Sequence, residues 1–593
     1  MGARSDPLRP DAVLRRNRAP ARLHPRDDAV PDRRVPNPWR AQAARPDRRV
    51  RPGGGRLLGA DGGGAGRLCR AAARSRDGGD GMIEGILTGL QTATSLTNIL
   101  MVAIGCFVGT FIGMLPGLGP ISAIALMIPI TYGFEPATGM ILLAGVYYGA
   151  IFGGSTSSIL INAPGVAGTV ATTFDGYPMA RKGMAGKALA IAAYSSFSGG
   201  TIAAIFLLIA APSLAAVSLS FQSSDYFALM VLGLTAVAAF AGKGEMIKAL
   251  MMTTFGLMLS TVGTDETQGV QRFTFGQLDL LDGISFLLLA MATFALSEAL
   301  MAVLRPVSDA ERKKEMDAQK SLGSMKLSRA EVAEMVPVIG RSSVLGFFVG
   351  VLPGAGATIA SFLAYGMEQR LAGREKGAEF GKGSIRGLAA PETANNAASS
   401  GSFVPLLTLG IPGSGTTAVM LGALISYGVQ PGPRLYVDEP ALFWSVIISM
   451  YIGNVILLIL NLPLIPYIAK ILAIPSTVLI PMIMFFSLIG VYFVSFNTFD
   501  IYLMVPFAAV AVGLRLLDFP MAPMLLGFIL GGMMEENLRR ALLINNDSWA
   551  FMWERPLTAT ILAIAILTLF APFISARLAG LFAKRREIAG EGG

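Results

Sequence analysis

A short pattern occurs twice in this chain, each time inside an apolar segment of the length that a membrane helix needs. Residues 109–120 read GTFIGMLPGLGP and residues 346–357 read GFFVGVLPGAGA, with the same spacing of Gly, Phe, Gly, Leu-Pro-Gly and Gly. Proline removes a backbone donor and glycine weakens a helix, so a helix should break at both places. Broken backbone persists at membrane depth only where protein buries it or where it lines a cavity. The fold must therefore hold two interrupted helices in its interior.

The composition supports a membrane location for these segments. Of the 593 residues, 53% are hydrophobic and only 15% are charged, which is too apolar for a soluble globule of this length. We predict an all-α integral membrane protein with about a dozen transmembrane helices, some of them broken or re-entrant. The candidate spans are 96–114, 120–134, 138–153, 188–211, 226–241, 246–262, 284–304, 336–351, 441–461, 477–495, 500–514, 520–534 and 557–576.

Residues 1–81 differ from the rest of the chain. They contain 19 Arg and 9 Asp, but no Lys, Glu, Ile, Phe, Tyr or Thr. They hold no apolar run long enough for a signal-peptide core, and they cannot bury a core of their own. We expect a disordered Arg/Pro/Gly-rich leader and a translation start at Met82. The alternative is a basic arm that binds nucleic acid or anionic lipid headgroups.

The charge pattern divides the remaining chain. We expect a first membrane repeat over 82–304, a linker over 305–335, a second repeat with C-terminal helices over 336–576 and a tail over 577–593. The linker and the tail are basic, so the positive-inside rule predicts that both are cytoplasmic. Their basic residues are Arg305, Arg312, Lys313, Lys314, Lys320, Lys326, Arg329, Arg577, Lys584, Arg585 and Arg586.

A second pair of related stretches follows the two breaks. YYGAIFGGSTSSILINAPGVAGT occupies 147–169 and APETANNAASSGSFVPLLTLGIPGSGTT occupies 390–417; both are rich in small, hydroxyl and amide residues and contain Pro-Gly. Between the break and its Pro-Gly, the first half carries a single charge, Glu135. Equivalent links should therefore face opposite sides of the membrane, which predicts two inverted repeats. The corresponding link of the second half carries Arg370, Arg374, Lys376, Lys382 and Arg386.

Paired interruptions in two halves predict a transporter binding site at the breaks. A broken helix exposes N–H groups at a partly positive end that can hold a carboxylate, and freed carbonyls can coordinate a small cation. Hydroxyls and amides suit either ligand. The substrate-binding candidates are Gly117, Gly119, Ser155, Thr156, Ser157, Ser158, Asn162, Gly165, Gly354, Gly356, Asn395, Asn396, Ser399, Ser400, Gly413, Thr416 and Thr417.

Glu392 is the candidate for ion coupling, because ionisable residues inside a membrane are usually functional. Its alternative is a loop position just outside the bilayer. The other candidates also have structural alternatives, namely close helix packing for the glycines and interhelical hydrogen bonds for the hydroxyls and amides. If both halves hold one ligand, Asn162 and Asn395 should contribute equally to its binding.

Four long motifs resemble one known family, in order along the chain. GMLPGLGP, YYGAIFGGSTSSILINAPG, DGYPMARKGMAGKAL (175–189) and AAPETANNAASSGSFVPLLTLGIPGSGTTAVMLGAL (389–424) are similar to the large membrane subunit of tripartite tricarboxylate transporters, the TctA type. The resemblance extends from Met82 to the C-terminus, and residues 1–81 have no counterpart in it. It implies a permease of the bacterial inner membrane that works with a small TctB-type membrane subunit. It also implies a periplasmic TctC-type solute-binding protein that delivers a carboxylate, and an ion gradient, of sodium or protons, that drives import.

Other function classes fit less well. His24 is the only His of the chain and Cys106 the only Cys after Met82, so the apolar part offers no His base for hydrolysis, no disulfide and no His/Cys metal site. The phosphate-binding loop of a primary pump is also absent from the sequence. We therefore expect no enzyme activity, no cofactor beyond the coupling cation and no nucleic-acid partner. A stand-alone carboxylate/cation symporter and a passive anion channel remain as alternatives.

Overall fold

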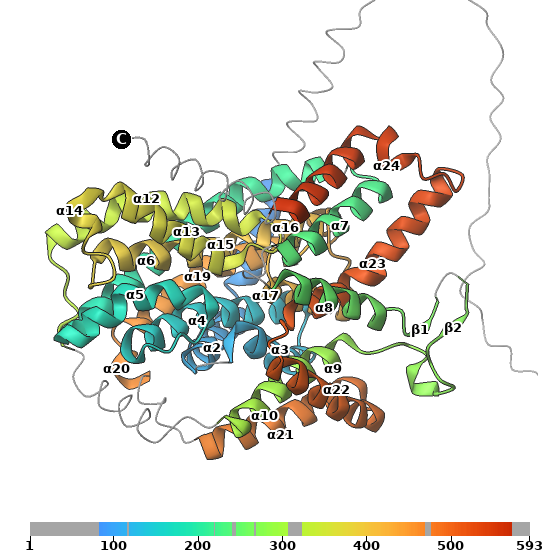
Figure 1. Ribbon diagram of the computed structural model, residues 1–593, viewed down its shortest axis with the longest axis horizontal. Helices are drawn as coiled ribbons and strands as arrows, with labels where there is room; N and C mark the ends of the chain where they lie inside the picture. Colours follow the sequence, from blue (N-terminus) through green and yellow to red (C-terminus); the bar gives the residue numbers. More distant parts are fainter. Residues whose placement is uncertain are drawn as a thin grey trace, which may run out of the picture. The chain divides into compact units, whose positions relative to one another are not determined.

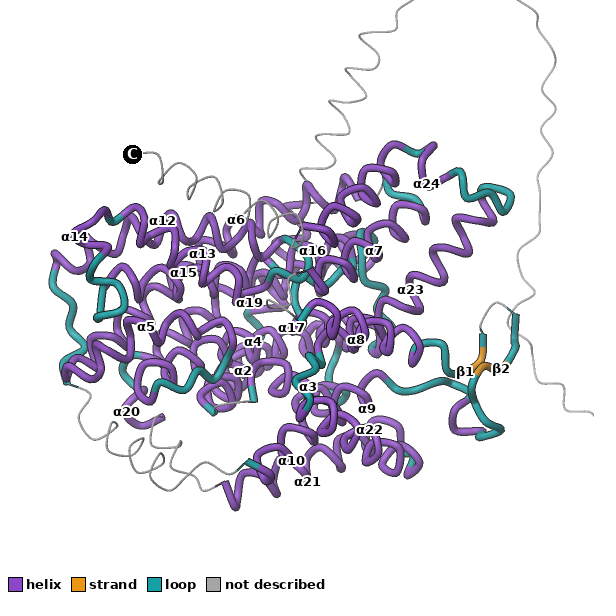
Figure 2. The backbone as a smooth tube through the Cα atoms, viewed as in Figure 1, coloured by secondary structure: helices purple, strands orange, loops and turns teal. Residues whose placement is uncertain are grey.

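The computed structural model describes residues 82–115, 118–218, 220–239, 245–265, 268–305, 323–468 and 476–571. The leader over 1–81, most of the linker and the tail over 577–593 lie outside these described residues. Nearly all of the described chain is helical, and Figure 2 shows strands only in one short ladder, β1 with β2.

The elements up to the linker are helices of different lengths and one pair of short strands. They begin after a helical segment over residues 82–93. In order they are α2 (Leu96–Met114), α3 (Gly119–Thr131), α4 (Pro136–Ile161), η1 (Ala167–Thr169), α5 (Val170–Met179), η2 (Ala180–Met184), α6 (Ala185–Ser218), α7 (Ser223–Ala239), α8 (Met246–Leu259), β1 (Gly263–Thr264), β2 (Gln271–Arg272), η3 (Leu278–Leu280), α9 (Phe286–Ala290), η4 (Met291–Leu296) and α10 (Ser297–Leu304).

The second part begins inside the predicted linker. Helix α12 (Arg329–Val351) starts there because Ser328 and Glu331 form a capping box at its N-terminus. The later elements are α13 (Gly356–Leu371), α14 (Gly373–Gly377), α15 (Ile385–Gly401), α16 (Phe403–Leu409), α17 (Gly415–Ser426), α18 (Leu435–Asp438), α19 (Pro440–Asn461), α20 (Ile465–Ile468), α21 (Ser476–Ser495), α22 (Thr498–Leu516), α23 (Ala522–Ile544) and α24 (Phe551–Glu554).

The described part of the chain does not confirm the predicted number of transmembrane helices. Among the described residues, seven helices are long and apolar enough to cross a membrane, and six further apolar helices are shorter. The expectation of about a dozen full spans is therefore not confirmed. Helix α3 shows the physical reason, because it begins at Gly119 directly after the first break and has only 13 residues.

Two helix pairs pack in the same way in the two halves. A Cβ at Gly109 would overlap the backbone of Val146, and a Cβ at Gly113 would overlap that of Ala150, so α2 lies directly against α4. In the second half, Gly346 faces Ala394 in the same way and Gly350 faces Ala398, which brings α12 against α15. The first two glycines of each copy of the duplicated pattern are therefore sites of close backbone contact.

The helices gather into groups that place the two central helices inside. Helix α15 packs against α12, α13 and α6, which lie together on the left of Figure 1. Helix α4 packs against α2, α3 and α19, and α23 packs against α7 and α8. Residues Gly387–Gly401 of α15 are all buried, although they include an acid, two amides and several hydroxyls. Such a polar helix must satisfy its groups inside the protein.

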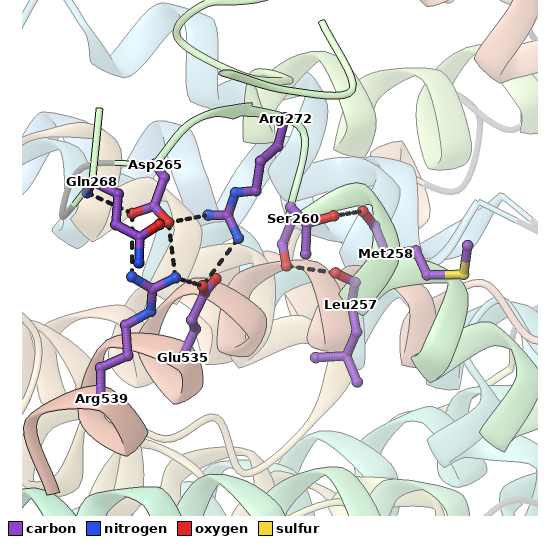
Figure 3. A network of polar contacts seen from close by, with 9 residues as sticks. Leu257, Met258, Ser260, Asp265, Gln268, Arg272, Glu535 and Arg539 are labelled. Carbon is purple, nitrogen blue, oxygen red and sulfur yellow. Dashed lines mark hydrogen bonds and ion pairs between the residues drawn. The ribbon is translucent and has the colours of Figure 1, made fainter. Parts of the chain in front are cut away.

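The loop between α8 and α9 is tied to the end of α23 by an ionic network, shown in Figure 3. Arg539 donates to Asp265 at 2.8 Å and to Glu535 at 2.7 Å, and Arg272 donates to Glu535 at 3.0 Å. The hydrogen bond to Asp265, with a further contribution from Glu535, raises the pKa of Arg539 above its ordinary value. Glu535 and Arg539, four residues apart on α23, thus form an ion pair to which the loop adds two partners.

Candidate functional site

The broken segments of the two halves meet one another. A Cβ at Gly168, after the first Pro-Gly, would lie 3.2 Å from the Ala357 side chain, directly after the second break. A Cβ at Gly415, after the second Pro-Gly, would lie 3.1 Å from Ile121, directly after the first break. Each break therefore touches the Pro-Gly segment of the other half.

Contacts within each half complete this meeting point. The Gly354 N–H donates to the Gly413 carbonyl at 3.0 Å, and Gly413 also lies against the Gly350 carbonyl. In the first half, Gly165 packs against the Gly113 carbonyl so closely that no Cβ would fit. The two breaks and the two Pro-Gly segments are thus brought together inside a helical protein.

Two helices begin at this point with no side-chain cap. Helix α3 starts at Gly119 with φ +61°, and α13 starts at Gly356 with φ +60°, so the two breaks share one backbone conformation that favours glycine. Their N-cap residues, Leu118 and Ala355, cannot accept a hydrogen bond through their side chains. N–H groups in the first turns of both helices are therefore available to an anion, except at Pro120 of α3, which has none.

A third helix that begins here is already capped. At the start of α17, Ser414 accepts from the Thr417 N–H at 3.3 Å, and the Thr417 hydroxyl accepts from the Ser414 N–H at 2.9 Å. Tyr147 of α4 reaches the same Ser414 hydroxyl at 3.5 Å. The Thr417 hydroxyl is thus used to cap the N-terminus of its own helix. Thr416 beside it is buried.

Glu392 lies at the centre of a separate buried cluster. It is 0% exposed, and hydroxyls of three other helices donate to its carboxyl group: Ser155 of α4 at 2.7 Å, Ser196 of α6 at 2.8 Å, and Thr172 of α5. No Lys or Arg of the described chain forms an ion pair with it. The alternative of an exposed loop position is therefore wrong, because Glu392 is inside α15.

The amides next to Glu392 connect this cluster to the broken segments. Asn396 donates to the Asn395 side chain at 2.8 Å and to the Glu392 carbonyl at 3.1 Å. Asn395 in turn donates to the carbonyl of Gly168 at 3.4 Å. One turn further along α15, Ser399 donates to the Asn395 carbonyl and Ser400 to the Gly200 carbonyl. The polar face of α15 thus runs from the carboxyl group toward the meeting point.

The remaining candidates of the first half are divided by burial. Ser155, Thr156, Ser157 and Ser158 are all buried in the last turns of α4, and Ser158 donates to Thr169 at 2.9 Å. Asn162 is different, because it is exposed and ends α4 in the left-handed region at φ +57°. Gly117 lies outside the described residues.

Several residues of the site escaped the sequence analysis. Thr172, Ser196, Thr169, Ser414 and Tyr147 all make the contacts given above. Ser196 had one usable signal, because it stands three residues before Gly199 of the pair Gly199-Gly200 in a largely apolar helix. Gly199 packs against the backbone of Thr393, the neighbour of Glu392. Thr172 had no comparable signal, since hydroxyls beside an Asp-Gly-Tyr-Pro stretch are ordinary turn residues.

The arrangement defines a class of protein. Apolar helices long enough to cross a membrane, with broken helices from two halves that meet inside, are typical of secondary transporters. The described residues contain no group of three or more His, Cys, Asp or Glu side chains that could hold a metal ion.

The comparisons with known proteins agree with this class. The family model of the tripartite tricarboxylate transporter TctA family matches residues 99–526, and the chain belongs to this family. Membership in this family implies that the chain is the membrane component of a tricarboxylate transporter. No solved structure matches the chain.

Two similar proteins come from Agrobacterium vitis. One, named as an uncharacterized 52.8 kDa protein in the TAR-I ttuC' 3'region, is 43% identical over 507 residues, which cover 86% of this chain and 98% of that protein. The other, named as an uncharacterized protein in the TAR-II ttuC' 3'region, is 43% identical over 243 residues, covering 41% of this chain and 98% of that protein.

Proposed function

We propose that this chain is the permease subunit of a secondary active transporter that imports tricarboxylates or related carboxylates across the bacterial inner membrane. A small TctB-type membrane subunit and a periplasmic TctC-type binding protein are its partners, and a sodium or proton gradient drives import. The membership in the TctA family supports the class of substrate and the tripartite assembly. The residues at the two breaks support the way in which the substrate is held.

The observation that carries the proposal is the pair of uncapped helix starts at Gly119 and Gly356. Each offers N–H groups at the partly positive end of a helix, and the two helices begin in segments that approach the same meeting point. A substrate with two or three carboxylates can engage both ends at once. No buried Arg or Lys is needed for this recognition, and the amides and hydroxyls around the breaks supply further hydrogen bonds.

Glu392 is the proposed ion-coupling group of this permease. Its carboxyl is buried without a basic partner among the described residues, and Asn395 links its helix to the Pro-Gly segment of the first half. A cation that neutralises Glu392 would therefore change the polar face next to the substrate.

The orientation of the two repeats is part of the proposal. The basic segments over 174–187 and 368–387 contact each other, since Lys182 donates to the Lys382 carbonyl at 2.6 Å, which supports placing both on the cytoplasmic side. Glu135 lies at the opposite end of the 26-residue helix α4, about 39 Å long. Single cysteines at these positions, after Cys106→Ala, should be labelled from opposite sides by a membrane-impermeant maleimide. Labelling of the Glu135 and Lys382 positions from the same side would refute the inverted arrangement.

The substrate site is tested by a change of charge at one uncapped helix start. Ala355→Asp places a carboxylate at the N-terminus of α13, whereas Ala355→Asn has nearly the same size and no charge. The chain is expressed with its two partner subunits, and uptake of radiolabelled di- and tricarboxylates is measured at several concentrations, normalised to protein in the membrane.

We expect the Asp variant to bind substrate at least about tenfold more weakly than the Asn variant, because a charged hydrogen bond contributes roughly 1.5–3 kcal/mol. Equal affinities in the two variants would remove the helix start from the site. Accumulation of substrate above its external concentration separates a transporter from a passive channel, and uptake without the partner subunits would indicate a stand-alone symporter.

A further inference from the structure

The polar contacts of Glu392 raise the question of which cation it takes up. Its two carboxyl oxygens accept from three hydroxyls, with Ser155 and Ser196 on one oxygen and Thr172 on the other. All four residues are buried, and they come from α15, α4, α6 and α5. The chain thus surrounds one carboxyl group with donors from three other helices.

The cationic groups of the helices that pack on α15 are engaged elsewhere. Arg341 of α12 donates to Glu368 of α13 at 2.6 Å, and Lys187 of α6 donates to Glu331 of α12 at 2.7 Å. Arg386 of α15 itself donates to Glu334 of α12 at 3.2 Å. Arg329 and Arg370 are exposed at helix ends. None of these side chains contacts the Glu392 carboxyl group in the described part of the chain.

The other titratable groups of these helices also make their hydrogen bonds with partners other than Glu392 in the described part of the chain. Asp175 of α5 accepts from the N–H groups of Gly381, Gly383 and Ser384 at 2.7–2.9 Å and from Tyr365 of α13 at 3.0 Å. The tyrosines of the packing helices, Tyr147, Tyr148, Tyr177 and Tyr194, form no hydrogen bond with Glu392 in the described chain. The Glu392 carboxyl group is therefore surrounded by the three hydroxyls and the neighbouring Asn395 side chain, with no charged partner in the described part of the chain.

The distances favour a proton over a metal cation. Ser155 and Ser196 approach the same carboxyl oxygen to 2.7 and 2.8 Å. At these distances the hydrogens of both hydroxyls lie between the oxygens and point at the carboxyl group. A metal ion between these oxygens would have to replace both hydrogen bonds, because a hydroxyl binds a metal through a lone pair, whereas a proton can bind without moving the oxygens apart.

The hydroxyls can also satisfy the protonated carboxyl group. The Ser155 hydroxyl lies 3.2 Å from the Ile151 carbonyl, and the Ser196 hydroxyl lies 3.4 Å from the Glu392 carbonyl. When the carboxyl oxygen carries a proton, Ser155 can accept that proton and donate to Ile151 instead. Every polar group then keeps a partner in both states, which is what a site that gains and loses a proton requires.

We propose that Glu392, with Ser155, Thr172 and Ser196, forms a proton-carrying site, so that one proton enters with each carboxylate substrate. This inference rests on the proposed carboxylate permease. The Glu392 side chain takes up a proton on the outer side, which makes its carboxyl group neutral, and releases the proton on the inner side. Thr172 and Ser196 act as positioning residues that hold the carboxyl group between the helices.

The first experiment measures proton movement with substrate. The chain and its partner subunits are reconstituted in proteoliposomes that contain a pH-sensitive dye, with equal sodium on both sides. We expect the wild type to acidify the lumen as carboxylate enters. Glu392→Gln should lose this acidification and the pH-driven accumulation while it retains exchange of internal for external substrate. Acidification by Glu392→Gln at the wild-type ratio to substrate would overturn the proposal.

Glu392→Asp keeps a titratable group and serves as the second variant. It should retain acidification but show a shifted dependence of uptake on external pH, because the shorter side chain changes the distances between the carboxyl group and the three hydroxyls. If Glu392→Gln loses exchange as well, this shift decides the question, and a pH dependence identical to the wild type would contradict the inference.

An infrared measurement separates this inference from the proposed function. In the purified complex, a band of a protonated carboxyl group should appear on acidification and be absent from Glu392→Gln. The band should persist in the control variant Asp175→Asn, because this change leaves Glu392 and its three hydroxyls in place. This readout needs no substrate. If no carboxylate of the panel is transported by the wild type, the proposed function fails while the band still tests the proton site. A band that persists in Glu392→Gln would refute the site.

Discussion

The two halves of the molecule have the same backbone at their breaks but different side chains around them. Gly113 packs on Ala150 in the first half, and Gly350 packs on Ala398 in the second. The helices that follow begin at φ +61° and +60°. In both halves the broken helix is therefore held by glycines that pack against the backbone of the facing helix, where no Cβ would fit.

The polar chemistry is distributed unequally. The first half contributes the hydroxyls of Ser155–Ser158, whereas the second contributes a carboxyl group, Glu392, with two neighbouring amides. Helix α17 carries a capping box, but α5 has no side-chain cap. The difference shows that helix packing determines the shape of the breaks, while the side chains beside them are free to take separate roles.

The largest expected effect tests the shared backbone. Gly113→Ala and Gly350→Ala should each strongly lower the amount of folded protein, because a Cβ at either position overlaps backbone of the facing helix and such overpacking costs several kcal/mol. Gly340→Ala on the same helix as Gly350 is the matched control, since nothing lies near its Cβ. Thermal melting monitored by size-exclusion chromatography in detergent gives the comparison. Tolerance of only one of the two substitutions would show that the halves are not equivalent.

The next effect concerns the unequal side chains. Asn395→Ala should weaken substrate affinity by about ten- to a hundredfold, since Asn395 is buried beside the Pro-Gly segment of the other half. Asn162→Ala should have a much smaller effect on affinity, because Asn162 is exposed at the end of α4. Concentration-dependent uptake in membranes with matched protein content measures both. Comparable losses would restore the equal contributions that the sequence predicted and would place Asn162 at the substrate.

A smaller effect is expected from the capping box at the start of α17, which α5 lacks. Ser414→Ala removes the acceptor for the Thr417 N–H at the start of α17 and should destabilise the protein by about 1 kcal/mol. Substrate affinity should change little, because this helix start is closed by its own side chains. A shift in melting temperature without a change in affinity is the expected result. A large loss of affinity with normal stability would show that Ser414 contacts the substrate.

The smallest effect lies outside both breaks, in the ionic network of Figure 3. Glu535→Ala removes one acceptor from Arg272 and Arg539, but Asp265 remains close to both. Exposed ion pairs contribute little, so uptake should stay within about a factor of two of the wild type. The same uptake assay measures it. Strong loss of transport in this variant would show that the loop between α8 and α9 takes part in the transport cycle.

Local sequence determined much of this protein. The duplicated Leu-Pro-Gly pattern placed both breaks, because proline and glycine act on the backbone wherever they stand. Apolar composition determined the membrane class, and the length of α3 follows from the break that precedes it. Glu392 was recognised as a candidate because charged residues are rare in apolar helices.

Only the tertiary structure decided which groups meet. Ser155 lies 237 residues from Glu392 along the chain and Thr172 lies 220 residues away, yet both donate to its carboxyl group. Asn162 and Asn395 belong to corresponding stretches, but one faces outward and the other is buried. Backbone breaks follow from the chemistry of residues that are neighbours in the sequence. Contacts between helices depend on how distant segments pack, which the sequence of a single helix does not determine.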